Sequence, residues 1–149
     1  MKFIKIIFFL LCFAFYHQNV LATHHDAKMI IKKSVPKSED FLTGEKIYKN
    51  NCASCHQKNL SGHPKWKTAL DKDGHRVAPP LNGTGHTWHH DDRTLFAIIK
   101  YGLNKLVKNY QGKMLGFGDK LSDQEIKQVL SYIKSYWNDE VYYYQLKLN

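Results

Sequence analysis

The chain has 149 residues, about the length of one domain, and a formal net charge of +9 at pH 7. The basic excess favours encounters with acidic partners. No nucleic-acid recognition motif accompanies it, so we do not expect nucleic-acid binding.

Residues 1–22 have the layout of a secretory signal peptide. Lys2 and Lys5 flank the start of an apolar run, residues 6–15, and small residues precede a cut site after Ala22. The run is shorter than the roughly 20 residues that a membrane-spanning helix needs. We therefore predict cleavage, export to the periplasm and no stable membrane insertion; an uncut leader would instead tether the protein to the membrane.

Three further divisions are predicted. Residues 23–37 are mostly polar and are expected to form a flexible lead-in, residues 38–137 the folded domain, and residues 138–149 an aromatic C-terminal tail that could extend as an edge ribbon. Cleavage after residue 22 would leave His25 third from the new amino terminus, where it could help to bind Cu(II) in a square plane. Scattered surface histidines are the alternative explanation.

A helix is predicted from Ser38 into the first cysteine motif, because Ser38 can cap it and acidic residues follow in its first turn. One face of this helix would carry Phe41, Gly44, Tyr48 and Cys55. Glycine inside a helix costs about 1 kcal/mol relative to alanine. Gly44 therefore indicates either the close approach of another backbone or a tolerated residue.

The motif CASCH, residues 52–56, holds the two cysteines that remain after the leader is removed. A redox dithiol would need a strand–turn–helix context, a zinc site would need a further pair of ligands, and a disulfide would leave the histidine unexplained. Covalent haem attachment explains every residue, since both thiols can add to porphyrin vinyl groups and the imidazole can bind the iron. We predict one haem c held by Cys52 and Cys55, with His56 as an axial ligand.

The next 34 or so residues, 57–90, are rich in glycine and proline and are predicted to be loop. A loop of this length is uncommon unless it wraps something. Two helices follow: one in DDRTLFAIIKYG, capped by Asp91 and stopped at Gly102, and one in LSDQEIKQVLSYIKSYW, with Ser122 and Glu125 as a capping box. So few short helices give a thin core, which a haem would fill.

Met114 is the predicted second axial ligand. After leader removal only Met29 and Met114 remain, and Met29 lies in the polar lead-in, whereas Met114 lies in the glycine-containing loop GKMLGFGDKLSD. Core packing is the alternative role for a lone methionine. His86, His89 or His90 could instead supply a second imidazole, which would change the reduction potential.

Together these pieces resemble the class I c-type cytochromes, small monohaem proteins of bacteria. The resemblance covers roughly residues 40–137 and rests on GEKIYKNNCASCH, APPLNG, MLGFGDKLSD and EIKQVLSYIKSYW. It implies an all-α cytochrome c fold, with three to five short helices and loops wrapped around one covalent haem. It also implies that the terminal helices cross with Gly44 and Tyr48 against Val129 and Tyr132.

The resemblance further assigns three residues of the long loop to the cofactor. The carbonyl of Pro79 would accept a hydrogen bond from Nδ1 of His56 and fix its tautomer. Leu81 would pack on the porphyrin. Trp88 would line a propionate, or alternatively serve as a core tryptophan.

The sequence departs from the family pattern in three places. Gln57 stands where glycine is usual after the ligand histidine, and Leu115 replaces the proline that commonly follows the ligand methionine. The stretch 57–78 is also long. Loss of the proline could loosen the loop that holds Met114.

Two axial ligands leave the iron no open position, so the expected function is single-electron transfer between redox partners in the periplasm, without catalysis. If Met114 did not bind, the open iron would make a peroxidase-like enzyme or the haem subunit of a larger oxidoreductase. A monomer is expected. Lysines around the Met114 loop are expected to steer an acidic redox partner, an oxidase, reductase or dehydrogenase, toward it; they are Lys100, Lys105, Lys108, Lys113 and Lys120.

Overall fold

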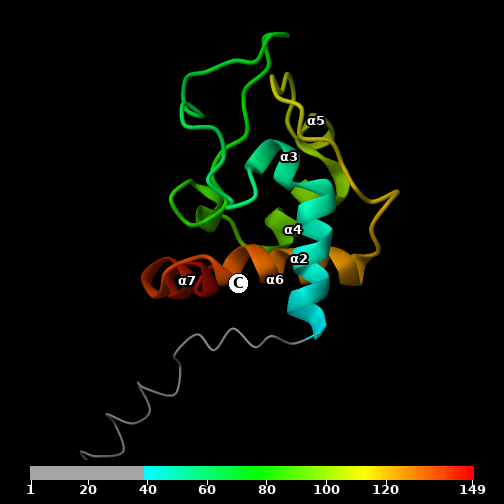
Figure 1. Cartoon of the computed structure of the whole chain (residues 1–149), viewed down its shortest axis with the longest axis vertical. Helices are drawn as coiled ribbons and strands as arrows, with labels where there is room; N and C mark the ends of the chain where they lie inside the picture. Colours follow the sequence, from blue (N-terminus) through cyan, green and yellow to red (C-terminus); the bar gives the residue numbers. More distant parts are fainter. Residues whose placement is uncertain (1–38) are drawn as a thin grey trace, which may run out of the picture. The chain divides into compact units, whose positions relative to one another are not determined.

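Helices and long loops build the structure, a computed structural model that describes residues 39–149 (Figure 1). In chain order the helices are α2 (Glu39–Asn51), α3 (Ala53–His56), the 3-10 helix η1 (Thr87–His89), α4 (Asp92–Tyr101), α5 (Leu103–Leu106), α6 (Asp123–Ser135) and α7 (Asp139–Leu146). Within residues 39–149, β-type pairing is confined to isolated bridges. The predicted all-α class is confirmed. The expected signal peptide, the lead-in and His25 lie outside the described residues.

Helices α2 and α6 cross each other (Figure 1), and Gly44 of α2 lies against the backbone of α6. A Cβ atom at Gly44 would overlap the carbonyl of Gln128 and would lie 3.0 Å from the Cβ of Tyr132. The ring of Tyr132 also lies 5.4 Å from that of Tyr48, and both side chains are buried. The close approach of the α6 backbone at Gln128 therefore explains why a glycine stands at position 44.

The caps predicted for α4 and α6 are confirmed. Asp91 accepts a hydrogen bond from the amide of Thr94, and α4 ends at Gly102, whose φ of 79° suits glycine. In α6, the Ser122 hydroxyl accepts from the amide of Glu125, and the Glu125 carboxylate accepts from the amide of Ser122. Both helices could be predicted because these signals are local in the sequence.

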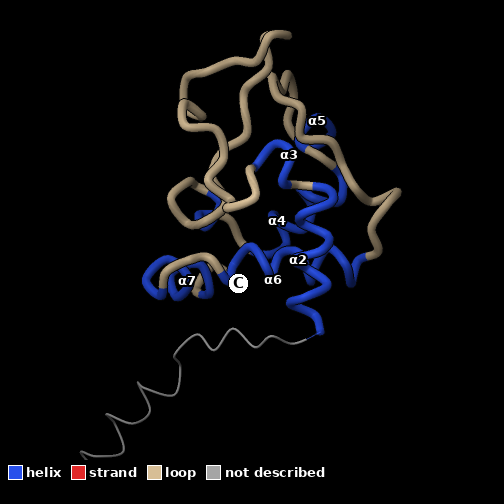
Figure 2. Tube along the Cα trace, viewed as in Figure 1, coloured by secondary structure: helices blue, strands red, loops and turns tan. Residues whose placement is uncertain are grey.

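The core is small and lies between α2, α4 and α6, whereas residues 57–86 are loop (Figure 2). Its buried hydrophobic members are Ile47, Tyr48, Leu60, Leu95, Ile99, Leu121, Ile126, Val129, Leu130, Tyr132, Ile133 and Trp137. Further apolar side chains pack against this cluster while staying partly exposed. No helix within residues 39–149 is long and apolar enough to cross a bilayer.

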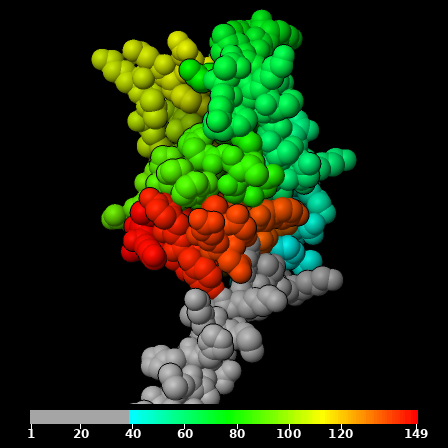
Figure 3. Space-filling view, turned by 90° about the vertical axis from the view of Figure 1, so that its left-hand side faces the viewer, coloured from blue at the N-terminus to red at the C-terminus, as the bar shows by residue number. Residues whose placement is uncertain are grey.

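The C-terminal tail is a helix, so the predicted edge ribbon was wrong. Asn138 caps α7 by accepting a hydrogen bond from the amide of Val141 at 2.9 Å. The helix packs against η1, and in Figure 3 its red surface lies directly beside the green loop residues. Buried Gln145 fastens it by donating to the carbonyl of His90 at 3.1 Å and to Asp92 at 2.7 Å. The short helix α5 was also not predicted.

Candidate functional site

The cysteine motif spans the junction of α2 and α3. The amides of Cys55 and His56 both donate to the carbonyl of Cys52, at 3.2 and 2.9 Å, which closes one helical turn. Cys52 is partly buried, Cys55 is exposed, and both are free thiols. Residues three apart on a helix lie on the same face, so the turn presents both thiols on one side.

Burial raises the pKa of the Cys52 thiol to about 11, and the neighbouring Cys55 adds to the rise. Cysteines of redox dithiols have lowered pKa values, because the thiolate is the reactive form. The surroundings of Cys52 therefore argue against the redox-dithiol alternative.

His56 is buried, and its Nδ1 lies 2.9 Å from the carbonyl oxygen of Pro79. A carbonyl can only accept, so Nδ1 carries the hydrogen and Nε2 has the lone pair that a metal needs. Burial lowers the pKa of His56 while this hydrogen bond opposes the shift. The hydrogen bond is the one that the sequence predicted; that His56 binds iron stays a prediction.

Gly62 holds the Pro79 carbonyl in place, and the sequence analysis missed it. Its amide donates to the carbonyl of His56 at 3.0 Å. Its φ is 61°, and a Cβ atom there would overlap the backbone of Pro79. Only glycine fits between these two segments. The glycine in SGHP was the available signal, but the segment that approaches it is 17 or so residues away, and no local pattern reveals that.

Gln57 adopts a backbone conformation that glycine favours, with φ 66° and ψ 155°. The hydroxyl of buried Tyr48 donates to the Gln57 carbonyl at 2.8 Å. This contact fixes the chain as it leaves His56. The positive φ of Gln57 explains in physical terms why glycine would be the ordinary residue at this position.

Leu81 and Trp88 both pack against the core cluster while staying partly exposed. The carbonyl of Leu81 accepts a hydrogen bond from the indole of Trp137 at 2.8 Å. The indole of Trp88 donates to the carbonyl of Gly85 at 3.0 Å, so this donor is used within the loop. Leu81 and Trp88 therefore both border the core cluster, and their contacts with the cofactor remain predictions.

Met114 lies partly buried against the same core cluster as Cys52, Leu81 and Trp88. The amide of Leu103 donates to the Met114 carbonyl at 3.0 Å, which places the methionine beside the end of α4. A Cβ atom at Gly102 would overlap the amide of Gly116, so these two segments touch through their glycines. The close approach of Gly102 and Gly116 thus allows the Met114 loop to lie directly on the end of α4.

The histidines considered as alternative ligands lie near η1. The ring of His86 stacks on Trp66 at 5.5 Å and meets the ring of His90 at 6.0 Å, while His89 stacks on Trp88 at 3.7 Å. Burial lowers the pKa of His86, and the nearby His90 and His89 contribute. Their rings are engaged with aromatic neighbours, which gives them a packing role independent of any metal.

These side chains fit a covalently attached haem. Two free thiols lie one helical turn apart, a buried imidazole is oriented through its Nδ1, and a methionine sulfur borders the same core. Cysteine thiols attach a c-type haem by adding to its vinyl groups, and histidine and methionine are the ligands that its iron uses in cytochromes c. Cys52, Cys55, His56 and Met114 would hold the group, and its apolar faces would complete the thin core.

Comparison with known proteins points the same way. The family model described as cytochrome c oxidase, cbb3-type, subunit III matches residues 39–133. Cytochrome c-552 of Thermus thermophilus is 36% identical over 100 residues, which cover 64% of this chain and 69% of the relative. No solved structure matches the chain significantly.

Two other relatives are cytochrome subunits of dehydrogenases. The fructose dehydrogenase cytochrome subunit of Gluconobacter japonicus is 30% identical over 101 residues, 64% of this chain. The gluconate 2-dehydrogenase cytochrome c subunit of Pantoea cypripedii is 26% identical over 118 residues, 73% of this chain. The aligned regions span only 19% and 23% of these two relatives.

Proposed function

Since this chain belongs to the c-type cytochrome family, whose members carry covalently bound haem c, we propose that it transfers single electrons between redox proteins. The iron of haem c supplies the chemistry by alternating between its ferrous and ferric states. The observation that carries the proposal is the buried His56 imidazole, oriented by the Pro79 carbonyl at 2.9 Å. The role is that of a carrier and not of an enzyme.

The side chains divide the work. Cys52 and Cys55 would tether the cofactor through thioether bonds, and His56 and Met114 would bind its iron. The Pro79 carbonyl accepts a hydrogen bond from the His56 ring and orients it. The Met114 loop accepts a backbone hydrogen bond from α5 and donates two to carbonyls of α4. Ligands held in both oxidation states need little rearrangement when an electron arrives or leaves.

Export to the periplasm is part of the proposal, as is action as a monomer. The leader sequence supports export, with a charged start, an apolar run and small residues before the cut. Sequencing the amino terminus of protein from a periplasmic fraction tests it. The expected first residue is Thr23; a retained leader would show a membrane-tethered form.

A subunit role in a larger oxidoreductase is the second candidate. The similarity to cytochrome subunits of fructose and gluconate dehydrogenases favours it and suggests a dehydrogenase as electron donor. Size-exclusion chromatography of native extracts separates the two roles. A carrier elutes at the size of the single chain, whereas a subunit elutes together with a larger partner protein.

Carbon monoxide tests whether the iron is closed. With both ligands bound, the reduced protein is expected to show no spectral change under the gas. The variant Met114→Ala is the positive control, because it opens one axial position and should bind carbon monoxide. Binding by the unaltered protein would instead support a peroxidase-like enzyme.

A further inference from the structure

The long segment 57–78 reaches the loop that carries Met114. The amide of Arg76 donates to the carbonyl of Gln111 at 2.7 Å, and Arg76 also forms a bridge with Gly112. In Figure 1 the two loops run side by side, green against yellow, at the end of the molecule away from α7. The segment that makes this protein longer than the family pattern therefore lies directly against the stretch before Met114.

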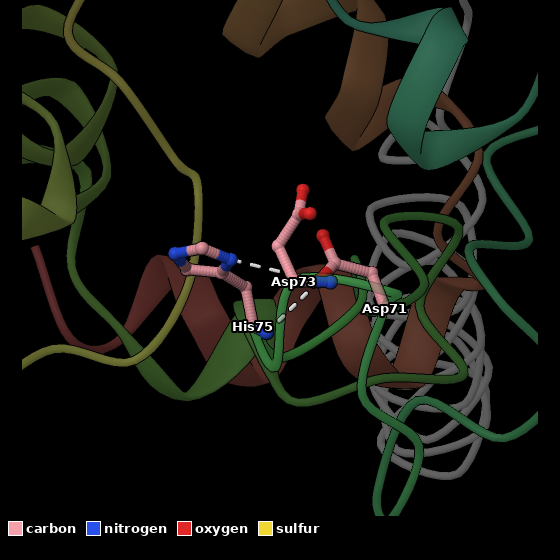
Figure 4. A group of neighbouring side chains, drawn as sticks. All are labelled: Asp71, Asp73 and His75. Atoms are coloured by element: carbon pink, nitrogen blue, oxygen red, sulfur yellow. Dashed lines mark hydrogen bonds and ion pairs between the residues drawn. The ribbon is translucent and has the colours of Figure 1, made fainter.

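Backbone hydrogen bonds fix the position of the Asp71 carboxylate. Its Oδ1 accepts hydrogen bonds from the amides of Asp73 and His75, both at 2.9 Å, and its own amide donates to the His75 carbonyl at 2.8 Å (Figure 4). Its Oδ2 meets the Lys113 ammonium at 2.9 Å. Asp73 adds a second contact to Lys113 at 2.5 Å. These three backbone contacts fix Asp71 independently of its ion pair with Lys113.

A metal ion is the other occupant that these side chains could attract. Donor atoms of Asp71, Asp73 and His75 lie within 4.8 Å of one another. The Lys113 ammonium already contacts both carboxylates, however, and a positive charge there opposes a cation. We therefore assign the cluster to Lys113.

We propose that Asp71 and Lys113 act as positioning residues for Met114, holding its sulfur on the iron. Lys113 directly precedes Met114, and the ion pair fastens this side of the loop to the segment 57–78. The opposite side is fastened to α4 and α5 by backbone hydrogen bonds, such as Leu103 to Met114. The pair takes the place of the proline that the family pattern has at position 115, where this chain has Leu115.

The inference rests on the proposed ligation by Met114, and imidazole binding tests it. Free imidazole reaches ferric iron only after Met114 leaves, so its dissociation constant includes the cost of opening the loop. The variant Asp71→Asn keeps an Oδ1 for the two backbone amides but presents an amide to Lys113 instead of a charge. We expect holoprotein with Asp71→Asn to bind imidazole about two- to five-fold more tightly, the range that a surface ion pair supports.

Matched variants test whether the change in imidazole affinity comes from the ion pair between Asp71 and Lys113. Lys113→Gln should tighten imidazole binding at least as much, because it also removes the contact with Asp73. The double variant Asp71→Asn/Lys113→Gln should add nothing beyond Lys113→Gln, because the Asp71 change acts through Lys113. Lys113→Arg should restore most of the unaltered affinity. Lys105→Gln removes a positive charge from an exposed lysine that forms no ion pair with the described residues, and it should leave imidazole binding unchanged.

Two failures are distinguishable. If the unaltered ferric protein lacks the weak far-red absorption of a sulfur–iron bond, Met114 is not the ligand, and the proposed ligation falls together with this inference. If that absorption is present but Asp71→Asn binds imidazole as the unaltered protein does, the ligand stands and the positioning role is overturned. Additive effects in the double variant would likewise overturn it.

Discussion

Gln57 directly follows the proposed haem ligand His56 and has a strained backbone conformation. Its φ of 66° and ψ of 155° lie in a region that is almost reserved for glycine. The hydrogen bond from the Tyr48 hydroxyl to the Gln57 carbonyl holds the backbone in this conformation. Strain of this kind costs of order 1–3 kcal/mol and persists only where the surroundings enforce it.

Gln57→Gly is therefore expected to raise the free energy of unfolding of the holoprotein by about 1 kcal/mol, after allowance for the greater freedom of glycine in the unfolded chain. Denaturant unfolding followed by circular dichroism measures it. Gln57→Ala is the control and should give no gain, because alanine keeps the strained backbone. Equal stability of the glycine variant and the unaltered protein would show that the position is not strained.

The residues proposed for covalent and ligand chemistry stand out in the sequence, whereas most of the residues that position them do not. CASCH and Met114 stand out because few other residue types can do what they do. Gly62 and Asp71 act through neighbours distant in the sequence, and neither makes a local pattern. The sequence analysis named the His56 to Pro79 hydrogen bond only through a family resemblance.

At the scale of elements, helices with both a cap and an apolar stripe were predicted, whereas α7, which has a cap at Asn138 but a tyrosine-rich sequence, was not. α4 and α6 carry caps and an apolar stripe, so their bounds follow from the sequence. The tail containing Tyr142, Tyr143 and Tyr144 has strand-like composition, yet its contacts with η1 and Asp92 make it α7. Contacts with the rest of the fold therefore favour a helix over a strand in this tail.

The crossing of α2 and α6 yields a direct test. Gly44→Ala adds a methyl group that would overlap the carbonyl of Gln128, so the helices must separate. We expect a loss of about 1–3 kcal/mol in the free energy of unfolding, even though alanine is the better helix former. Denaturant titration measures the loss, and Lys46→Ala, an exposed change in the same helix, is the control. A gain in stability at Gly44 would contradict the close crossing.

Helix α7 depends on one buried amide. Gln145 is fully buried and donates to the carbonyl of His90 and to Asp92, which also pairs with Lys134. Removing the amide takes the donor from the His90 carbonyl, while Asp92 keeps its ion pair with Lys134, so Gln145→Ala is expected to cost about 1–3 kcal/mol. Limited proteolysis should then cut the tail sooner than in the unaltered protein, whereas Gln124→Ala, exposed on α6, should not change the cleavage rate. Unchanged cleavage of the Gln145 variant would mean that the amide does not fasten α7.

At the scale of the whole molecule, the positive charge has an uneven distribution around the Met114 loop. Lys100 pairs with Asp123 at 2.7 Å, and Lys113 pairs with Asp71 and Asp73. The other three lysines of the group are exposed and form no ion pair with the described residues; they are Lys105, Lys108 and Lys120. These three are the better candidates for steering an acidic partner.

Association with the redox partner is accordingly expected to slow as ionic strength rises, since salt screens exposed charges beyond about 10 Å at 0.1 M. Stopped-flow electron transfer with the physiological donor or acceptor measures the rate. Lys105→Gln and Lys108→Gln should lower it at low salt and converge with the unaltered protein at high salt. Lys147→Gln, on the C-terminal tail, is the control for net charge. A rate that ignores salt would contradict steering.

The central claim is that one haem is covalently bound through Cys52 and Cys55. Mass spectrometry of the denatured protein, matured by cells with a working haem-attachment system, tests it most directly. The expected mass is that of the chain without its leader plus one haem. The haem mass should be absent when both cysteines are replaced by alanine. A denatured protein with the mass of the bare polypeptide would contradict it.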